Sequence, residues 1–437
     1  MIQIFRLDWA RFLAYFARVA LPHFVVLMAL GFTGSVPIPP AVADDWPQWR
    51  GARRDDVSRE KGLLRHWPEG GPKLVWLSRE IGLGYSGPAI VGNLLTIMGA
   101  RDGQEKLFAI DVRTGKELWS RDIGATYANN WGDGPRGTPT IDGDRIYALG
   151  AQGNLICADA KHGEMRWQVA LPDLGGEVPN WGYSESVLVD GPQVVCVPGG
   201  SKGAVAAFDK MTGKLLWQST DFQDPAQYTS LVPMEHGGVR QYVVLTESHV
   251  AGIAAQTGAV LWQSDWVGAT AIAPTPICHD GHVYVTSGYG AGCKLIRLEA
   301  DGTTKDLYAN KIMKNHHGGA ILVGDHVYGY SDGVGWLCQN LKSGEMAWNQ
   351  KDDLGKGAIA CADGMLYCLD EKEGTVVLIE ASPLGWKEQG RLQLKPLTEQ
   401  RKPSGGIWTH PVIANGRLYV RDQELLFSFD VKRNAQE

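Results

Sequence analysis

Short runs of alternating apolar residues recur eight times along the chain, and each run follows a tight polar turn. The turns are built on Gly, Asp or Asn and lie at 92–93, 142–143, 190–191, 236–238, 280–281, 324–325, 363–364 and 415–416. Such turns between β-branched and aromatic runs are a strong β-hairpin signal, because their central residues need positive φ. A unit repeated at about 40 to 50 residues is typical of propellers. The pattern therefore predicts eight β-sheet units.

A second motif follows the hairpins. Residues 109–119 read Ala-Ile-Asp-Val-Arg-Thr-Gly-Lys-Glu-Leu-Trp, and residues 207–217 repeat the alanine, aspartate, threonine, glycine and tryptophan of that run. Weaker copies end at Trp167, Trp262 and Trp348, two more are degraded near 299–308 and 380–392, and the eighth ends near Asp430 without a tryptophan. The motif predicts a positive-φ glycine between the third and fourth strands of a unit and a tryptophan wedged between units.

This motif resembles the repeat of pyrroloquinoline quinone (PQQ)-like propellers, the superfamily that contains BamB and the quinoprotein alcohol dehydrogenases. The resemblance implies an all-β, eight-bladed β-propeller with four-stranded antiparallel blades. The last blade lacks an outer strand, and residues 74–76 (Leu-Val-Trp) are placed to supply it, so that N- and C-terminal strands would share one blade and close the ring.

The first 43 residues have the composition of a secretory signal. Arg6, Arg11 and Arg18 precede an apolar run over 19–32, and Ala41-Val42-Ala43 offers a cleavage site. An uncleaved anchor is the alternative, although the run is short for a membrane span. We expect a signal peptide at 1–43, a leader at 44–73 that packs on the propeller, and the propeller itself at 74–437. The mature protein is then exported to the periplasm or the exterior, without a membrane span.

Net charge and cysteine content limit the classes of partner and of covalent cross-link that the sequence predicts. The formal net charge of −6 gives no basic surface for nucleic acid. The seven cysteines lie mostly in apolar strand-like contexts, which favours buried thiols over a disulfide framework. We expect a monomer that binds a protein partner or a small polar ligand.

The loops that enter the innermost strands ring the mouth of a propeller channel, and here the sequence stops repeating. Besides Tyr85 and Tyr228, the candidate ligand-binding residues in these loops are Trp131, Arg136, Trp181, Tyr183, Glu185, His316, His317, Trp408 and His410.

Each candidate also has a structural interpretation. Trp131 and Trp181 could clamp loops, and Arg136 could pair with Glu185 across blades instead of serving as an anion clamp and a base. His316 and His317 should point to opposite faces unless the chain bends, so a three-histidine metal site with His410 is imaginable but not required by the spacing. No metal ligand is assigned.

Three functions remain open. The favoured one is a non-catalytic binding or assembly scaffold. The alternative is a PQQ-dependent dehydrogenase of alcohols or sugars with PQQ and calcium, in which Arg136 holds the quinone carboxylates and Glu185 or Asp133 is the base. The resemblance implies a vicinal cysteine pair beside that cofactor, whereas no two cysteines here are adjacent and no Cys-x-x-Cys-His haem motif occurs. The third is carbohydrate binding through Trp131 and Trp181.

Overall fold

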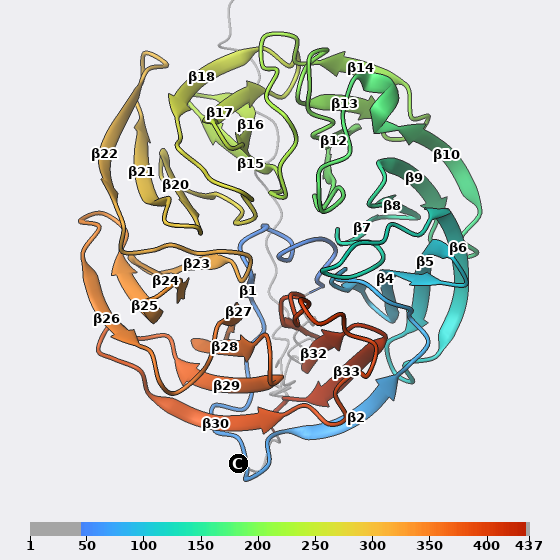
Figure 1. Ribbon diagram of the computed structural model, residues 1–437, viewed down its shortest axis with the longest axis vertical. Helices are drawn as coiled ribbons and strands as arrows, with labels where there is room; N and C mark the ends of the chain where they lie inside the picture. Colours follow the sequence, from blue (N-terminus) through green and yellow to red (C-terminus); the bar gives the residue numbers. More distant parts are fainter. Residues whose placement is uncertain (1–44, 434–437) are drawn as a thin grey trace, which may run out of the picture. The chain divides into compact units, whose positions relative to one another are not determined.

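The computed structural model describes residues 45–433, which form eight β-sheets arranged around a common centre (Figure 1). The expected signal peptide lies outside the described residues. Seven sheets have four strands and one has five. Helical structure in the described chain is confined to the short 3-10 helix Leu171–Leu174, and none of it is long and apolar enough to cross a membrane. The predicted all-β, eight-bladed propeller is confirmed.

Blades 1 to 4 run from the innermost to the outermost strand in chain order. Their strands are β3 (Ala89–Val91), β4 (Leu94–Arg101), β5 (Gln104–Asp111) and β6 (Glu117–Ala125); β7 (Thr140–Asp142), β8 (Arg145–Leu149), β9 (Asn154–Asp159) and β10 (Met165–Ala170); β11 (Leu188–Asp190), β12 (Gln193–Cys196), β13 (Ala206–Asp209) and β14 (Leu215–Gln218); β15 (Val232–His236), β16 (Val239–Leu245), β17 (His249–Ala254) and β18 (Val260–Asp265).

Blades 5 to 8 complete the ring. Their strands are β19 (Ile277–His279), β20 (His282–Ser287), β21 (Gly292–Leu298) and β22 (Thr304–Asn310); β23 (Ala320–Val323), β24 (His326–Ser331), β25 (Gly335–Asn340) and β26 (Met346–Gln350); β27 (Gly357–Ala362), β28 (Met365–Asp370), β29 (Thr375–Glu380) and β30 (Glu388–Gln393); β31 (Val412–Ala414), β32 (Arg417–Asp422), β33 (Leu425–Asp430) and β2 (Lys73–Ser78). Each predicted turn joins the first two strands of its blade.

The ring closes as the sequence predicts. Strand β2 pairs antiparallel with β33, with Lys73 opposite Asp430 and Trp76 opposite Ser428, so the outer strand of blade 8 comes from the other end of the chain. One strand was not expected. Strand β1 (Val57–Ser58), in the leader, pairs in parallel with β27 and adds a fifth strand to the inner edge of blade 7.

The repeated tryptophans and glycines join neighbouring blades. Trp119 of blade 1 donates from Nε1 to the carbonyl of Ala160 in blade 2 at 3.3 Å. Its ring covers Gly163, which has a φ of +68°, and a Cβ on that glycine would lie 2.4 Å from Trp119 Cε3. Trp76, Trp167 and Trp217 donate to the next blade in the same way. The glycine therefore serves both the turn and the close approach of an indole.

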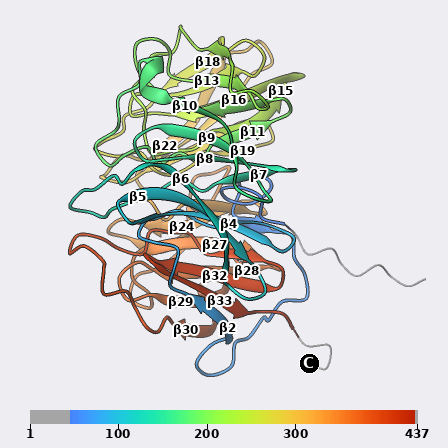
Figure 2. The same ribbon diagram turned by 90° about the vertical axis from the view of Figure 1, so that its right-hand side faces the viewer.

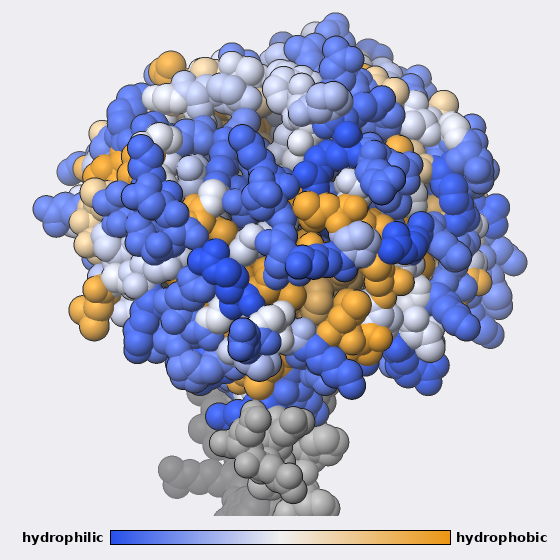
Figure 3. All heavy atoms as spheres, turned by 60° about the horizontal axis from the view of Figure 1, so that its bottom comes forward, coloured by the Kyte–Doolittle hydropathy of each residue, from blue (hydrophilic) through white to orange (hydrophobic). Residues whose placement is uncertain are grey.

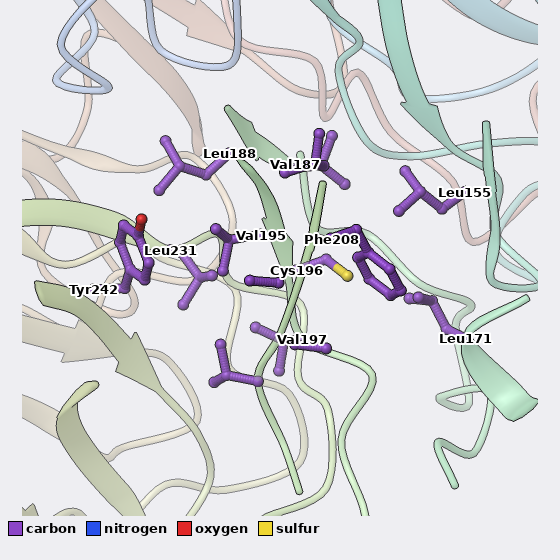
Figure 4. Close-up of a cluster of buried hydrophobic side chains, with 14 of the residues drawn as sticks. Leu155, Leu171, Val187, Leu188, Val195, Cys196, Val197, Phe208, Leu231 and Tyr242 are labelled. Carbon is purple, nitrogen blue, oxygen red and sulfur yellow. The ribbon is translucent and has the colours of Figure 1, made fainter. Parts of the chain in front are cut away.

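The apolar core lies between blades as well as within them. In the cluster of Figure 4, Leu155 and Leu171 of the blade 2 region meet Phe208 of blade 3, while Tyr242 of blade 4 approaches from the other side. The face drawn in Figure 3 is mostly hydrophilic, with smaller apolar areas between the hydrophilic side chains. The packed blades thus form the frame that carries the loops at the ring's centre.

Candidate functional site

A cavity of about 190 Å³ lies at the centre of the ring, and we call it the central cavity. Four tryptophans line it: Trp49, Trp131, Trp181 and Trp408. Tyr85, Tyr228 and Tyr289 add three more rings. Most of these side chains come from the loops that enter the innermost strands, because those loops converge at one mouth of the channel. An aromatic wall of this kind offers stacking surfaces to a flat ligand.

The rings of the wall are packed against one another. Tyr85 stacks on Trp408 with centroids 4.9 Å apart, and its hydroxyl donates to the carbonyl of Trp131 at 2.6 Å. Trp181 meets the edge of Tyr228 at 5.6 Å. Trp131 remains 44% exposed, so part of its indole is open to solvent. These contacts orient the rings before any ligand binds.

Arg136 supplies the positive charge of the cavity wall. Its Nη2 donates to the carbonyl of Gly132 at 2.9 Å and its Nη1 to that of Gly134, while the guanidinium lies 4.9 Å from the ring centre of Tyr127. Burial lowers the pKa of Arg136. Among the described residues no carboxylate lies within ion-pairing distance of this side chain. An arginine held this way is available to an anionic group.

His316 and His317 both face the central cavity, since the chain bends at residues 317–318. Lys356 Nζ donates to His316 Nδ1 at 2.8 Å, and burial lowers the pKa of His316 to about 2, so this ring is neutral. His317 Nε2 lies 2.5 Å from Glu371 Oε2. Burial is also the main cause that lowers the pKa of His317, against the opposing effect of Glu371.

His410 lies beneath this wall rather than in it, and it is 3% exposed. Its Nδ1 lies 3.0 Å from Asp56 Oδ2 and its Nε2 lies 3.0 Å from the carbonyl of His317. These two contacts tie the imidazole to the leader on one side and to the cavity wall on the other. The three histidines gather in one place, yet each binds a different neighbour. The part of the chain that the structure describes contains no cluster of three or more metal-ligating side chains.

The predicted residues separate into two groups. Trp131, Arg136, Trp181, His316, His317 and Trp408 line the central cavity, whereas Tyr183, Glu185 and His410 do not. Ser184 and Ser186 line the cavity instead, because side chains alternate along an extended segment and Tyr183 and Glu185 point the other way.

Buried behind the wall, Tyr183 donates to the carbonyl of Pro198 at 2.9 Å, and Glu185 accepts from the amide of Val197 at 2.7 Å. Burial raises the pKa of Glu185 to about 8. The interpretation in which Glu185 pairs with Arg136 does not match these contacts. Asp133, the other proposed base, pairs with Lys402 at 3.2 Å.

Sequence reasoning missed two aromatic lining residues. Tyr289 sits in the turn between β20 and β21, which opens on the same end of the ring as the entry loops. Trp49 belongs to the leader, which lies outside every repeat. One signal could have found Trp49. Its segment has no blade of its own, yet it gathers Trp46, Trp49 and Arg50.

The lining does not suit PQQ with calcium. Calcium takes six to eight oxygen ligands, mostly carboxylates and carbonyls. None of the described residues that line the cavity carries a carboxylate. The nearby Asp133, Asp332 and Glu371 are each occupied by a lysine or histidine partner. The donor set therefore does not fit the calcium-bound cofactor.

Comparison with known proteins gives one family and several relatives. The family model described as outer membrane protein assembly factor BamB matches residues 103–377. Tetrathionate hydrolase of Acidithiobacillus ferrooxidans is 26% identical over 59% of this chain and 51% of its own length. BamB of Kangiella koreensis is 27% identical over 46% of this chain and 48% of its own length. The chain thus spans about half the length of these two relatives.

Among solved structures, quinohemoprotein alcohol dehydrogenase from Comamonas testosteroni superposes with a TM-score of 0.63 at 11% identity. The match covers 90% of this chain and 81% of that one. At this identity the likeness concerns the fold alone.

Proposed function

This chain belongs to the family described as outer membrane protein assembly factor BamB, and from that premise we propose that it is an exported, non-catalytic binding scaffold. Its binding site is the central cavity, which holds a small, flat, anionic ligand or a group of that chemistry on a protein partner. The family name supports a binding role, because it describes an assembly factor. Fold alone does not assign a chemistry.

One observation carries the choice of ligand. Arg136 brings a positive charge to an aromatic wall, and none of the described lining residues is a carboxylate. Glu105 and Asp133 act on this charge from outside the lining, without a direct ion pair. Stacking on indole and phenol rings favours a flat group, and the guanidinium favours a carboxylate, sulfonate or phosphate. A cationic ligand would meet the same guanidinium and be repelled.

Calorimetry with 2-naphthalenesulfonate, a flat anion, tests this site. We expect saturable binding by the full chain and a loss of at least tenfold in affinity for Arg136→Gln and for Trp181→Ala. Arg113→Gln is the matched control, since Arg113 is exposed and pairs with Asp111 on a blade turn. Equal affinity in Arg136→Gln and Arg113→Gln would refute the assignment of the cavity.

The scaffold role is tested in envelope extract. Wild-type protein should recover a specific partner, and Arg136→Gln should recover less of it. Failure to recover any partner, together with dye-linked oxidation of alcohols or sugars by the purified protein, would instead establish the dehydrogenase.

The dehydrogenase remains the second candidate because the dehydrogenase subunit of alcohol dehydrogenase (quinone) from Gluconobacter oxydans is 31% identical over 35% of this chain and 21% of its own length. Titration with PQQ and calcium, followed by absorbance, decides it. We expect no binding at micromolar PQQ, since the described lining residues offer calcium no carboxylate. Carbohydrate binding is tested in parallel with the Trp131→Ala, Trp181→Ala double variant, whose glycan binding should equal that of the wild type if sugars are not the ligand.

Export and the oligomeric state can each be measured directly. Sequencing the N-terminus of the mature protein should give a start at residue 44, and fractionation should place it outside the cytoplasm. Light scattering should give the mass of a monomer.

A further inference from the structure

The leader segment 45–58 lies across the centre of the ring, toward one of its faces, and contacts the innermost strands or entry loops of seven of the eight blades (Figures 1 and 2, blue). The contacts, in order from blade 1 to blade 8 with blade 4 omitted, are Trp46 with Ile90, Pro47 with Ile141, Arg54 with Ser186, Trp49 with Thr275, Arg50 with Ala320, Val57 with Cys361, and Asp56 with His410. A short segment is therefore held by almost the whole ring.

Three buried charged residues anchor this segment. Arg50, Arg54 and Asp56 are each 1% or 2% exposed. Arg50 Nε pairs with Asp56 at 2.8 Å, and its Nη2 donates to the carbonyl of Ala320 at 2.7 Å. Arg54 Nη2 donates to the carbonyl of Ser186 at 2.6 Å. Buried charges are stable only when their partners are in place, so the leader and the innermost strands depend on each other.

The same segment reaches the central cavity. Trp49 lines the cavity, and its Nε1 donates to Thr275 Oγ1 at 3.1 Å. The Trp49 ring lies 4.5 Å from that of His410. His410 binds Asp56 on one side and the carbonyl of His317, another lining residue, on the other. A continuous set of contacts thus joins the leader's anchor to two sides of the cavity.

We propose that the leader is a working part of the binding site: Trp49 forms part of the wall of the central cavity, and leader docking and ligand binding stabilise each other. This rests on the proposed function for the existence of a ligand. The coupling follows because a ligand that contacts Trp49 binds only the docked state, and such linkage is reciprocal. Asp56 acts as a positioning residue, since it does not line the cavity.

Hydrogen exchange of the full wild-type chain tests the coupling directly. With 2-naphthalenesulfonate at about ten times its dissociation constant, amides of segment 45–58 should exchange about tenfold more slowly if undocking requires an empty cavity. Unchanged exchange in this segment while the probe is bound would overturn the proposal.

A matched pair of variants gives an independent readout. Asp56→Asn keeps every cavity-lining residue, yet it weakens the contacts to Arg50 and His410, and we expect at least a tenfold loss of probe affinity. Asp55→Asn is the control, because Asp55 is the next residue and pairs with the exposed Arg53 within the leader. Equal probe affinity in the two variants would count against the coupling.

A folding check and a replacement variant separate a loss of folding from a loss of coupling. Far-UV circular dichroism checks that Asp56→Asn folds, and if it does not, Thr275→Val, which removes the Trp49 hydrogen bond, replaces it with the same expected loss. Absence of probe binding by the wild type would refute the proposed function. Binding that depends on Arg136 but not on Asp56 or Thr275 would refute only this inference.

Discussion

Arg421 on β32 fastens the last blade to the first, and its replacement by methionine should weaken the closed ring. The side chain is 1% exposed. Its guanidinium donates to the carbonyls of Ser86 at 2.8 Å, Met98 at 2.7 Å and Gly82 at 3.0 Å, which belong to blade 1 and the segment before it. A fourth bond goes to the carbonyl of Gln423 at 2.7 Å.

Two opposing effects set the size of the loss. Hydrogen bonds from a charged donor contribute about 1.5 to 3 kcal/mol each, so the three between blades contribute about 5 to 9 kcal/mol. Burial, opposed by the charges of Glu424, Tyr85 and Asp422, lowers the pKa of Arg421 to about 9, which is a net cost to its charged form of about 4 to 5 kcal/mol. Methionine keeps the volume but leaves buried carbonyls without donors. We expect Arg421→Met to lower the free energy of unfolding by about 3 kcal/mol.

Urea unfolding followed by tryptophan fluorescence and circular dichroism measures this loss. Arg417→Met is the control, because Arg417 lies on the same strand but makes a single long bond, 3.4 Å, to Ser428 Oγ. If the two variants unfold within about 1 kcal/mol of each other, the carbonyl bonds of Arg421 do not hold the seam and the reasoning is wrong.

Three other predictions follow from buried groups. Gly163→Ala should lose about 2 kcal/mol more in thermal unfolding than Gly143→Ala, since both glycines have positive φ but only a Cβ at 163 would meet an indole; equal losses would contradict this. Burial raises the pKa of Glu185 from 4.5 to about 8, so the folded chain keeps a proton that the unfolded chain releases. The stability of wild type relative to Glu185→Gln should therefore fall by about 2 kcal/mol or more between pH 5 and pH 8, and a pH-independent difference would refute it. All seven cysteines carry free thiols, of which Cys278 alone is not buried, so a thiol reagent should titrate at most one in the native protein and seven after denaturation; fewer than seven would reveal a disulfide.

The fold was predictable because its information is local and repeated. Each Asp-Gly or Asn-Gly turn specifies a hairpin by itself, and eight copies specify eight blades. The ring closure was predictable as well, because the last repeat lacks an outer strand and the segment around Trp76 could supply one. The parallel strand β1 was not predictable in this way, since it occurs once and its partner is distant in sequence.

For the site, the sequence predicts which loops surround the cavity but not which of their side chains line it. Knowing that residues 180–185 enter an innermost strand places them at the channel mouth, but it does not say which side chains face inward. The register put Ser184 inside and Glu185 behind the wall. Trp49 reaches the cavity through contacts with Thr275 and His410, which no local pattern encodes.

The pairing of β2 with β33 has a consequence for how the protein is made. The strand that completes blade 8 is among the first of the described chain to leave the ribosome, and its partner is among the last. Until β33 has been synthesised, the growing chain carries two unsatisfied sheet edges, and bringing such distant segments together is slow. A nascent chain of this design is exposed to wrong pairing for the whole of its synthesis, so its demand on holding chaperones should exceed that of a protein whose last strand pairs with its neighbour.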